Sequence, residues 1–275
     1  MTPWPIGQKT KADLLCAIFA SNSTLDDNGK TPPTIPRCQS SMPEVQSRQK
    51  TVTRALFSLE VRKSSGPDGI SPIVLRTCAP ELTPLLTRLF RHFYSKGEVP
   101  VSWKSALVHP IRKKGDSSDP ANYRPFAITS LLSKIMESII NRQLLIYLEG
   151  HQLINDRQYG FRHGRSAGDL LVYLTHRWAA ANESKGEGLA VSLDIAKAFD
   201  RVWHKALLSK FPSFGLPESL CKWTSSFLTR RSIHLYVRRQ RPRCRRTGVP
   251  QGCVVSPTLL LLHINDMLDT SNMQT

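Results

Sequence analysis

Residues 189–195 alternate between two kinds of side chain, and this alternation constrains the fold more than any other stretch. Side chains of a strand point to opposite faces with a period of two. One face is apolar and the other is small with a carboxylate: Val191, Leu193 and Ile195 on the first, and Ala190, Ser192 and Asp194 on the second. The apolar face suits packing on helices, and the small face leaves room for a bulky ligand. The stretch therefore predicts a half-buried strand that ends beside a candidate site.

Most other patterned segments repeat their apolar residues at helical spacing. Helices are expected within residues 47–59, 82–97, 135–150, 166–178, 217–227 and 256–267. Strands are expected at 106–111 and 123–128, joined as a hairpin, and at 233–237. Residues 1–42 are rich in Pro, Asn, Ser and Gly and are expected to form a poorly ordered linker. Because strands do not alternate regularly with helices, an α+β layout is favoured over a doubly wound sheet.

The charge balance favours a polyanionic partner. The 275 residues carry 38 Lys and Arg against 21 Asp and Glu, which gives a formal charge of +17. Residues 219–265 contain no acidic residue, while eight arginines lie within 230–246, Arg238 and Arg239 among them. This stretch could be a solvated basic loop or a contact with a nucleic-acid backbone, whose affinity would depend strongly on salt. Charge alone does not separate the two.

Other sequence features bear on the compartment. No apolar run reaches the ~20 residues of a transmembrane helix, and no secretory signal opens the chain. We therefore expect no membrane contact and an intracellular protein, nuclear or cytoplasmic. The six cysteines form no C-x-x-C pair, which disfavours a zinc site. In an intracellular protein they are expected to be reduced thiols without a disulfide partner.

Two short motifs carry the residue types of a catalytic site. Asp194-Ile-Ala-Lys-Ala-Phe-Asp200 brings two carboxylates and an aromatic ring together at the end of a strand. Taken alone, each carboxylate could cap a turn or sit in a first helical turn, and Phe199 could belong to the core. The loop Gly248-Val-Pro-Gln-Gly252 adds independent information. Its glycines let the backbone approach a ligand closely, and Gln251 supplies an amide.

Five segments together resemble the reverse transcriptases of non-LTR retrotransposons, closest to the jockey-like elements of insects. They agree in order and spacing from about residue 43 to 270. The segments are KSSGPDGI (63–70), ANYRPFAITSLLSKIMESII (121–140), LINDRQYGFRHGRSAGDLL (153–171), SLDIAKAFDRVWHKALL (192–208) and GVPQGCVVSPTLLLLHIND (248–266).

The resemblance implies a right-hand polymerase fold with fingers and an incomplete palm, helix-rich with a small antiparallel palm sheet. Residues 1–42 would be the linker, 43–188 a fingers-like helical region and 189–275 the partial palm, with the reverse transcriptase domain over approximately 94–275. The implied partners are an RNA template, a DNA primer and a dNTP. The primer 3′-hydroxyl would attack the α-phosphate while two Mg²⁺ ions hold the attacking and leaving oxygens.

The resemblance also implies roles around the metal and the nucleotide. Asp194 would be the first metal-binding aspartate, and the carbonyl of Ile195 a further ligand. Phe199 would stack under the sugar and reject a 2′-hydroxyl. Gln251 and Gly252 would line the template and the incoming base.

Further roles concern phosphate and template. Arg124 would grip the triphosphate together with Lys113 or Lys114, as charge complementarity independently supports. These cations could equally be surface groups of a solvated turn, and the sequence does not choose between the two lysines. A template-contacting segment would comprise Gly160, Phe161, Arg162 and Ser166, although Phe161 could be plain core.

Departures from the family pattern limit these implications. The sequence reaches Thr275 without a Tyr-x-Asp-Asp motif, so one strong carboxylate stands where the mechanism uses three. We therefore expect weak or absent Mg²⁺ binding and a catalytically incompetent polypeptide. The arginine-dense stretch before Gly248 and the Phe126 after Tyr-Arg-Pro are also unusual. Two alternatives follow: a non-catalytic, basic nucleic-acid-binding remnant, or a pseudogene product without a stable fold.

Overall fold

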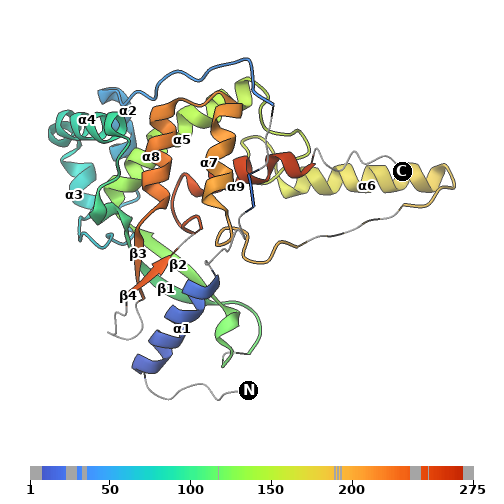
Figure 1. Ribbon diagram of the computed structural model, residues 1–275, viewed down its shortest axis with the longest axis horizontal. Helices are drawn as coiled ribbons and strands as arrows, with labels where there is room; N and C mark the ends of the chain where they lie inside the picture. Colours follow the sequence, from blue (N-terminus) through green and yellow to red (C-terminus); the bar gives the residue numbers. More distant parts are fainter. Residues whose placement is uncertain are drawn as a thin grey trace.

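The computed structural model describes residues 8–22, 30–32, 36–116, 118–188, 190, 192, 194–235, 243–246 and 248–268. Helices dominate these residues, and one small sheet lies beneath them (Figure 1). The helices are α1 (Gln8–Asn22), α2 (Gln49–Phe57), α3 (Pro72–Thr77), α4 (Ala79–Lys96), α5 (Leu131–Gly150), α6 (Ala167–Glu183), α7 (His204–Lys210), α8 (Glu218–Leu228) and α9 (Ser256–Ile264). The strands are β1 (Ser105–Arg112), β2 (Tyr123–Thr129), β3 (Arg231–Leu235) and β4 (Arg243–Arg246).

The sheet has the strand order β2-β1-β3-β4. The predicted hairpin is confirmed, because β1 and β2 pair antiparallel from Ala106↔Thr129 to Arg112↔Tyr123. The pair β3 and β4 is also antiparallel, but β3 runs parallel to β1. The prediction of an antiparallel sheet is therefore wrong, and the sheet is mixed. The long crossover through α5 to α8 permits this, since a parallel partner needs a connection of a dozen residues or more.

The strand predicted at 189–195 is not seen in its described residues. Residues 190, 192, 194 and 195 have no strand pairing, and 189, 191 and 193 lie outside the described residues. An extended segment becomes a strand only when its N–H and C=O groups find a partner ladder. The sheet is built from other segments, and none of its described strands accepts this one.

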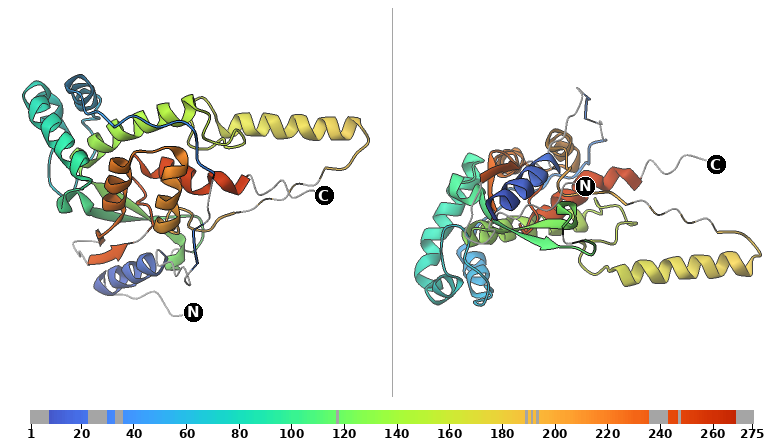
Figure 2. Two further views of the ribbon diagram at one scale, coloured as in Figure 1. Left: turned by 45° about the horizontal axis from the view of Figure 1, so that its top comes forward. Right: turned by 90° about the horizontal axis from the view of Figure 1, so that it is seen from below.

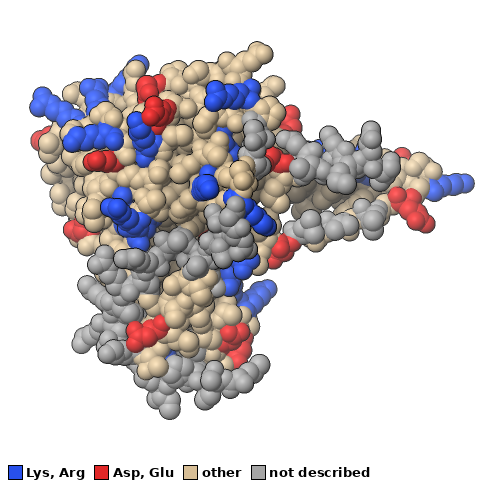
Figure 3. All heavy atoms as spheres, in the orientation of Figure 1, with Lys and Arg blue, Asp and Glu red and all other residues tan. Residues whose placement is uncertain are grey.

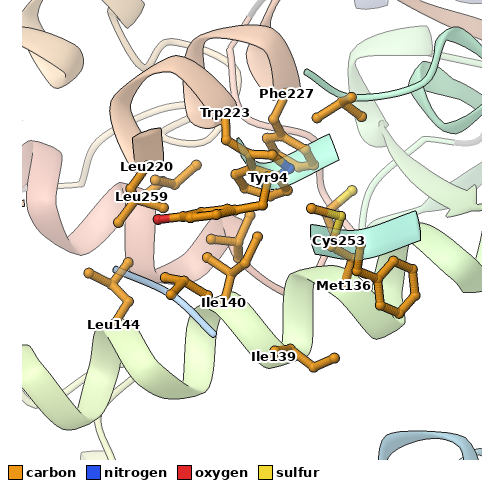
Figure 4. Packing of buried hydrophobic residues seen from close by; sticks show 14 of the residues in the cluster. Tyr94, Met136, Ile139, Ile140, Leu144, Leu220, Trp223, Phe227, Cys253 and Leu259 are labelled. Carbon is orange, nitrogen blue, oxygen red and sulfur yellow. The ribbon is translucent and has the colours of Figure 1, made fainter. Parts of the chain in front are cut away.

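The main core surrounds α5 (Figure 4). One face of α5 is buried as its apolar spacing predicts, through Ile135, Met136, Ile139, Ile140 and Leu144. The predicted stripe of α8 lies in the same core, with the rings of Trp223 and Phe227 stacked at 5.3 Å between centroids. Each such fully buried side chain stabilises the fold by roughly 1.5–3 kcal/mol.

The helix predicted at 82–97 is longer at its start. It begins at Ala79, with Pro80 in the first turn, where a proline is tolerated, and Pro84 lies further inside the helix. It ends as predicted at Gly97, whose φ of 65° is left-handed. The Gly97 N–H bonds to the carbonyl of Tyr94, and that of Glu98 to Phe93, which closes the helix with the αL turn that glycine favours.

Residues 8–22 form α1 rather than part of a poorly ordered linker. Ala12, Leu15, Cys16 and Phe19 follow the i, i+3, i+4, i+7 spacing and pack on one face of the sheet, against Val108, Ala127 and Ile233 among others. Figure 1 shows α1 crossing beneath the strands. The apolar sheet face supplies the partner that makes this short helix stable.

Among the cysteines whose side chains the structure describes, Cys16 departs from the expected reduced state. Cys38, Cys78, Cys221 and Cys253 are free thiols, but Cys16 is disulfide-bonded. The packing of α1 across the sheet puts Cys16 at a buried position that the spacing of cysteines along the chain does not reveal.

Helix α6 projects away from the rest of the molecule (Figure 2). Its predicted start at Ser166 is confirmed by a capping box, in which the Ser166 and Asp169 side chains each bond the other's backbone N–H. Its apolar side chains find little cover, since Leu171 is 60% exposed and Trp178 48%. Within the described residues, no helix is both long and apolar enough to span a membrane.

Candidate functional site

The loop 248–252 lies between the turn that ends at Asp200 and strand β2. At its first end, the Val249 N–H donates to the carbonyl of Phe199 at 2.8 Å. Gly248 has a φ of 72°, and a side chain there would collide with the carbonyl oxygens of Phe199 and Asp200. Only glycine fits both the left-handed backbone and the close approach.

The other end of the loop docks on β2. The Ala127 N–H donates to the carbonyl of Gln251 at 3.2 Å. Gly252, with a φ of 107°, passes so close that a Cβ would collide with the carbonyl oxygen of Ala127. The two glycines of the motif therefore each serve a close backbone contact, one on either side of Gln251.

The side chains of both predicted motifs meet at this place. The Gln251 amide Nε2 donates to Oδ2 of Asp200 at 3.4 Å, and Asp200 is only 5% exposed. The half-buried ring of Phe199 meets the ring of Phe161 edge to face, with centroids 5.9 Å apart. Phe161 has a φ of 58°, a strained conformation for a residue with a side chain, and is 57% exposed.

Strand β2 carries the predicted triphosphate-binding residue. Arg124 pairs with Ile111 of β1 and is exposed, whereas Ala127 faces α1. The Lys113 N–H donates to the carbonyl of Asn122 at 2.6 Å, which extends the ladder by one step. By strand alternation, Lys113 shares the face of Ile111 and Arg124, and Lys114 does not.

The two predicted metal ligands take no part in the hydrogen bonds described above for this loop. Asp194 and Ile195 are both exposed. Within the described part of the chain, no group of three or more His, Cys, Asp or Glu side chains is gathered as a metal site would require. One exposed carboxylate does not make the oxygen cage that Mg²⁺ prefers. The described residues alone therefore do not supply the ligand set of a pair of Mg²⁺ ions.

Two of the residues predicted to contact the template have internal partners. The Arg162 side chain is 6% exposed, and its guanidinium binds both carboxylate oxygens of Glu149 and the carbonyl of Asn155. Ser166 Oγ caps α6. Gly160 and Phe161 remain exposed. Arg238 and Arg239 lie outside the described residues.

Sequence reasoning missed Glu137, which supports the loop from behind. Its carboxylate is fully buried on α5 and accepts hydrogen bonds from Ser133 Oγ at 2.8 Å and from the Val254 N–H at 2.7 Å. Burial raises its pKa, while Ser133 and the charge of Arg231 oppose this. A carboxylate among the apolar positions of a core helix was the available signal.

His204 contacts the opposite end of the loop 248–252, at Gly248. Its Nε2 lies 2.8 Å from the carbonyl of Gly248, so Nε2 carries the proton. Burial lowers its pKa, and the hydrogen bond partly offsets this. Asp266, close to the motif in sequence, is used elsewhere, in an ion pair with the buried Lys210.

Residues 111–274 match the reverse transcriptase (RNA-dependent DNA polymerase) family. The chain is 32% identical over 232 residues to the RNA-directed DNA polymerase from mobile element jockey of Drosophila melanogaster. The aligned residues make up 83% of this chain and 25% of that protein. The chain is equally similar to the "Probable RNA-directed DNA polymerase from transposon BS" of the same fly, with 83% and 26% covered.

A more distant relative is the Pol polyprotein of type-1 retrotransposable element R2 of Popillia japonica, 29% identical over 191 residues, with 66% of this chain and 26% of that protein covered. The chain thus spans about a quarter of the length of these relatives. The family match covers more than half of the chain and includes β2, the Asp194–Asp200 turn and the Gln251 loop. The chain belongs to the reverse transcriptase family, and the relatives that it resembles include RNA-directed DNA polymerases of mobile elements such as jockey.

Proposed function

We propose that this chain is the fingers and the first part of the palm of an RNA-directed DNA polymerase that extends a DNA primer on an RNA template. One observation carries the proposal. The Gln251 loop contacts Asp200 on one side and the backbone of β2 on the other. Three segments that are about 50 to 125 residues apart in sequence therefore converge on one place.

Each converging segment brings a group suited to part of a nucleotide. Arg124 and Lys113 share a face of the hairpin and suit a triphosphate, because a guanidinium binds phosphate oxygens in a bidentate manner. Phe199 is available as a ring under the sugar. Gln251 and Gly252 present an amide and a close backbone to a base. Gly160 and Phe161, beside Phe199, extend the surface along the template.

The reaction in this proposal is nucleotidyl transfer to the primer 3′-hydroxyl, and Asp194 would hold metal only together with carboxylates that the described residues do not supply. These 275 residues alone are proposed to be inactive, since they offer Asp194 without the further carboxylates of the mechanism. The test is primer extension on poly-rA/oligo-dT with Mg²⁺. No product above background is expected from this polypeptide. Extension that Asp194→Ala abolishes would refute the inactivity and would keep the polymerase assignment.

A second candidate is a non-catalytic protein that holds nucleic acid without extending a primer. The formal charge of +17 favours it. An electrophoretic shift with RNA over a salt series separates the outcomes: a shift that weakens with salt supports it, and none at low salt removes it. A sharp, cooperative thermal transition would count against the further alternative of a chain without a stable fold.

A further inference from the structure

A hollow of about 390 Å³ lies away from the Gln251 loop, between α2, α5 and the segment 43–48. Arginines stand on both sides of it: Arg48 and Arg54 at α2, and Arg142 on α5. Helix α2 packs against both α4 and α5. Figure 3 shows basic side chains interspersed with a few acidic ones over the upper part of the face that it draws.

The wall of the hollow is held in place by Gln143. Its Oε1 accepts the Gln46 N–H at 3.0 Å, and its Nε2 donates to the Gln46 carbonyl at 3.3 Å and to the Ile139 carbonyl at 3.0 Å. This paired amide fastens the extended segment 43–48 to α5. The hollow is therefore preorganised, which lowers the entropic cost of binding a ligand.

The guanidinium groups around the hollow have no acidic partner. Within the described residues, Arg48, Arg54 and Arg142 form no ion pair. Arg48 is oriented by a fork of two bonds to Oε1 of Gln46, at 3.1 and 3.0 Å. The one carboxylate in the lining, Glu44, instead accepts a bond from Ser219 of α8. Three cations that share one hollow repel each other, and an anion between them removes that repulsion.

We propose that this hollow, named here the arginine groove, binds the phosphodiester backbone of a single RNA strand. The proposal deepens the proposed function and rests on it, since it adds a second contact for the template outside the Gln251 site. A guanidinium offers a planar fork of donors that matches phosphate oxygens. Cations on both walls suit a strand that passes between them.

Two features favour a nucleic-acid strand over a free phosphate ion or an acidic peptide. Ile146, on the rim, is 64% exposed, and gives a sugar or base an apolar surface that a phosphate ion would leave uncovered. The arginines are spread over two walls of the hollow, so they can bind more than one phosphate of a strand, whereas a free phosphate ion offers only one.

The test compares two variants of equal charge. Arg54→Gln/Arg142→Gln removes two groove cations, and Arg76→Gln/Arg88→Gln removes two exposed arginines of α3 and α4 that do not line the groove. Binding of a fluorescein-labelled 20-nucleotide RNA is followed by anisotropy between 50 and 300 mM salt. The groove variant is expected to lose about tenfold in affinity at 100 mM, and its plot of log K against log salt to flatten by about 1.4. The control variant is expected to stay within about twofold of the wild type.

Several outcomes would overturn the proposal. If both variants lose the same RNA affinity, the loss reflects the net charge of the chain and not the groove. If the groove variant loses as much affinity for duplex DNA as for single-stranded RNA, a single strand is excluded as the ligand of the groove. Inorganic phosphate at matched ionic strength should not displace RNA selectively from the wild type; if it does, the groove takes a free anion. Thermal melts of all variants exclude unfolding as the cause.

Failure of the groove and failure of the polymerase assignment are distinguishable. Asp194→Asn is expected to bind RNA as the wild type does, because it leaves the groove intact. If RNA binds normally to the groove variant while primer extension by a longer chain still depends on Asp194, the groove proposal fails and the function stands.

Discussion

The carboxylate of Glu137 on α5 accepts a hydrogen bond of 2.7 Å from the backbone N–H of Val254, just before α9 begins. A second bond of 3.4 Å from Val255 reaches the same oxygen. A carboxylate at a helix N-terminus satisfies donors that the helix leaves free. Through this contact a core helix determines where the Gln251 loop ends.

Glu137→Ala is expected to lower the free energy of unfolding by about 1–3 kcal/mol, because it leaves the half-buried Val254 N–H and the buried Val255 N–H without their acceptor. Urea unfolding measures this loss, and amide hydrogen exchange should show faster exchange in 253–255 than in α8. Lys134→Ala, at a half-buried position of the same helix, serves as the control for a change of charge on α5. An unchanged midpoint for Glu137→Ala would show that the bond contributes nothing.

Glu137 also predicts a pH dependence. Its pKa is raised in the folded state by burial, so the folded chain binds its proton more tightly than the unfolded chain does. Stability from this group is therefore present below its ordinary pKa of 4.5 and is lost as the pH rises through the folded value. Relative to Glu137→Gln, the wild type should lose stability as the pH rises from about 4.5. Parallel urea curves at every pH would contradict this.

His263 is expected to act in the opposite direction. Burial, followed by the charge of Lys210, lowers its pKa from 6.5 to about 4. Stability from neutral His263 is present above pH 6.5 and is lost as the pH falls through about 4. As the pH falls from 6.5 to about 4, the wild type should lose unfolding free energy relative to His263→Gln, so any advantage of the wild type should shrink or reverse. A difference that does not vary with pH would exclude this role.

Gly248→Ala combines a left-handed backbone with a collision against Asp200, whereas Gly69→Ala has the same kind of backbone, with a φ of 69°, and open space around it. Strain alone costs about 1 kcal/mol for a side chain in this region. We expect Gly69→Ala to lose about that much and Gly248→Ala clearly more, in chemical denaturation. Equal losses would mean that the loop moves away from Asp200 without cost.

Arg162→Ala separates an internal anchor from a template contact. If Arg162 is an internal anchor, its removal lowers the free energy of unfolding by about 2 kcal/mol. The loss is below that of a fully buried pair because Glu149 keeps part of its contact with solvent. The anchor also predicts an unchanged salt dependence of RNA binding. A double-mutant cycle with Glu149→Gln isolates the pair. Unchanged stability with a flatter salt slope would assign Arg162 to the template instead.

The elements that could be predicted are those whose partners the chain itself supplies nearby. The stripe of α8 and the face of α5 follow from apolar spacing, Gly97 ends α4, and Ser166 caps α6. The β1–β2 hairpin is likewise local. The sequence assigns residues 8–22 to a linker because the composition of residues 1–42 does not favour a helix. Helix α1 is stabilised instead by the face of the sheet that it covers. The strand predicted at 189–195 is not seen in the described residues of that stretch, because alternation describes a strand's faces but does not provide its neighbour.

For the site, the sequence by itself determined the chemical inventory: the carboxylates of the Asp194–Asp200 turn, the cations of the hairpin, and the glycines on either side of Gln251. Only the tertiary structure decided that Gly248 lies against Asp200, that Gly252 lies against Ala127, and that Glu137 accepts the Val254 N–H. The reason is physical. Helical and strand periods are set by neighbours a few bonds apart, whereas these contacts join residues 48 to 125 positions apart and depend on how α5 and the sheet pack.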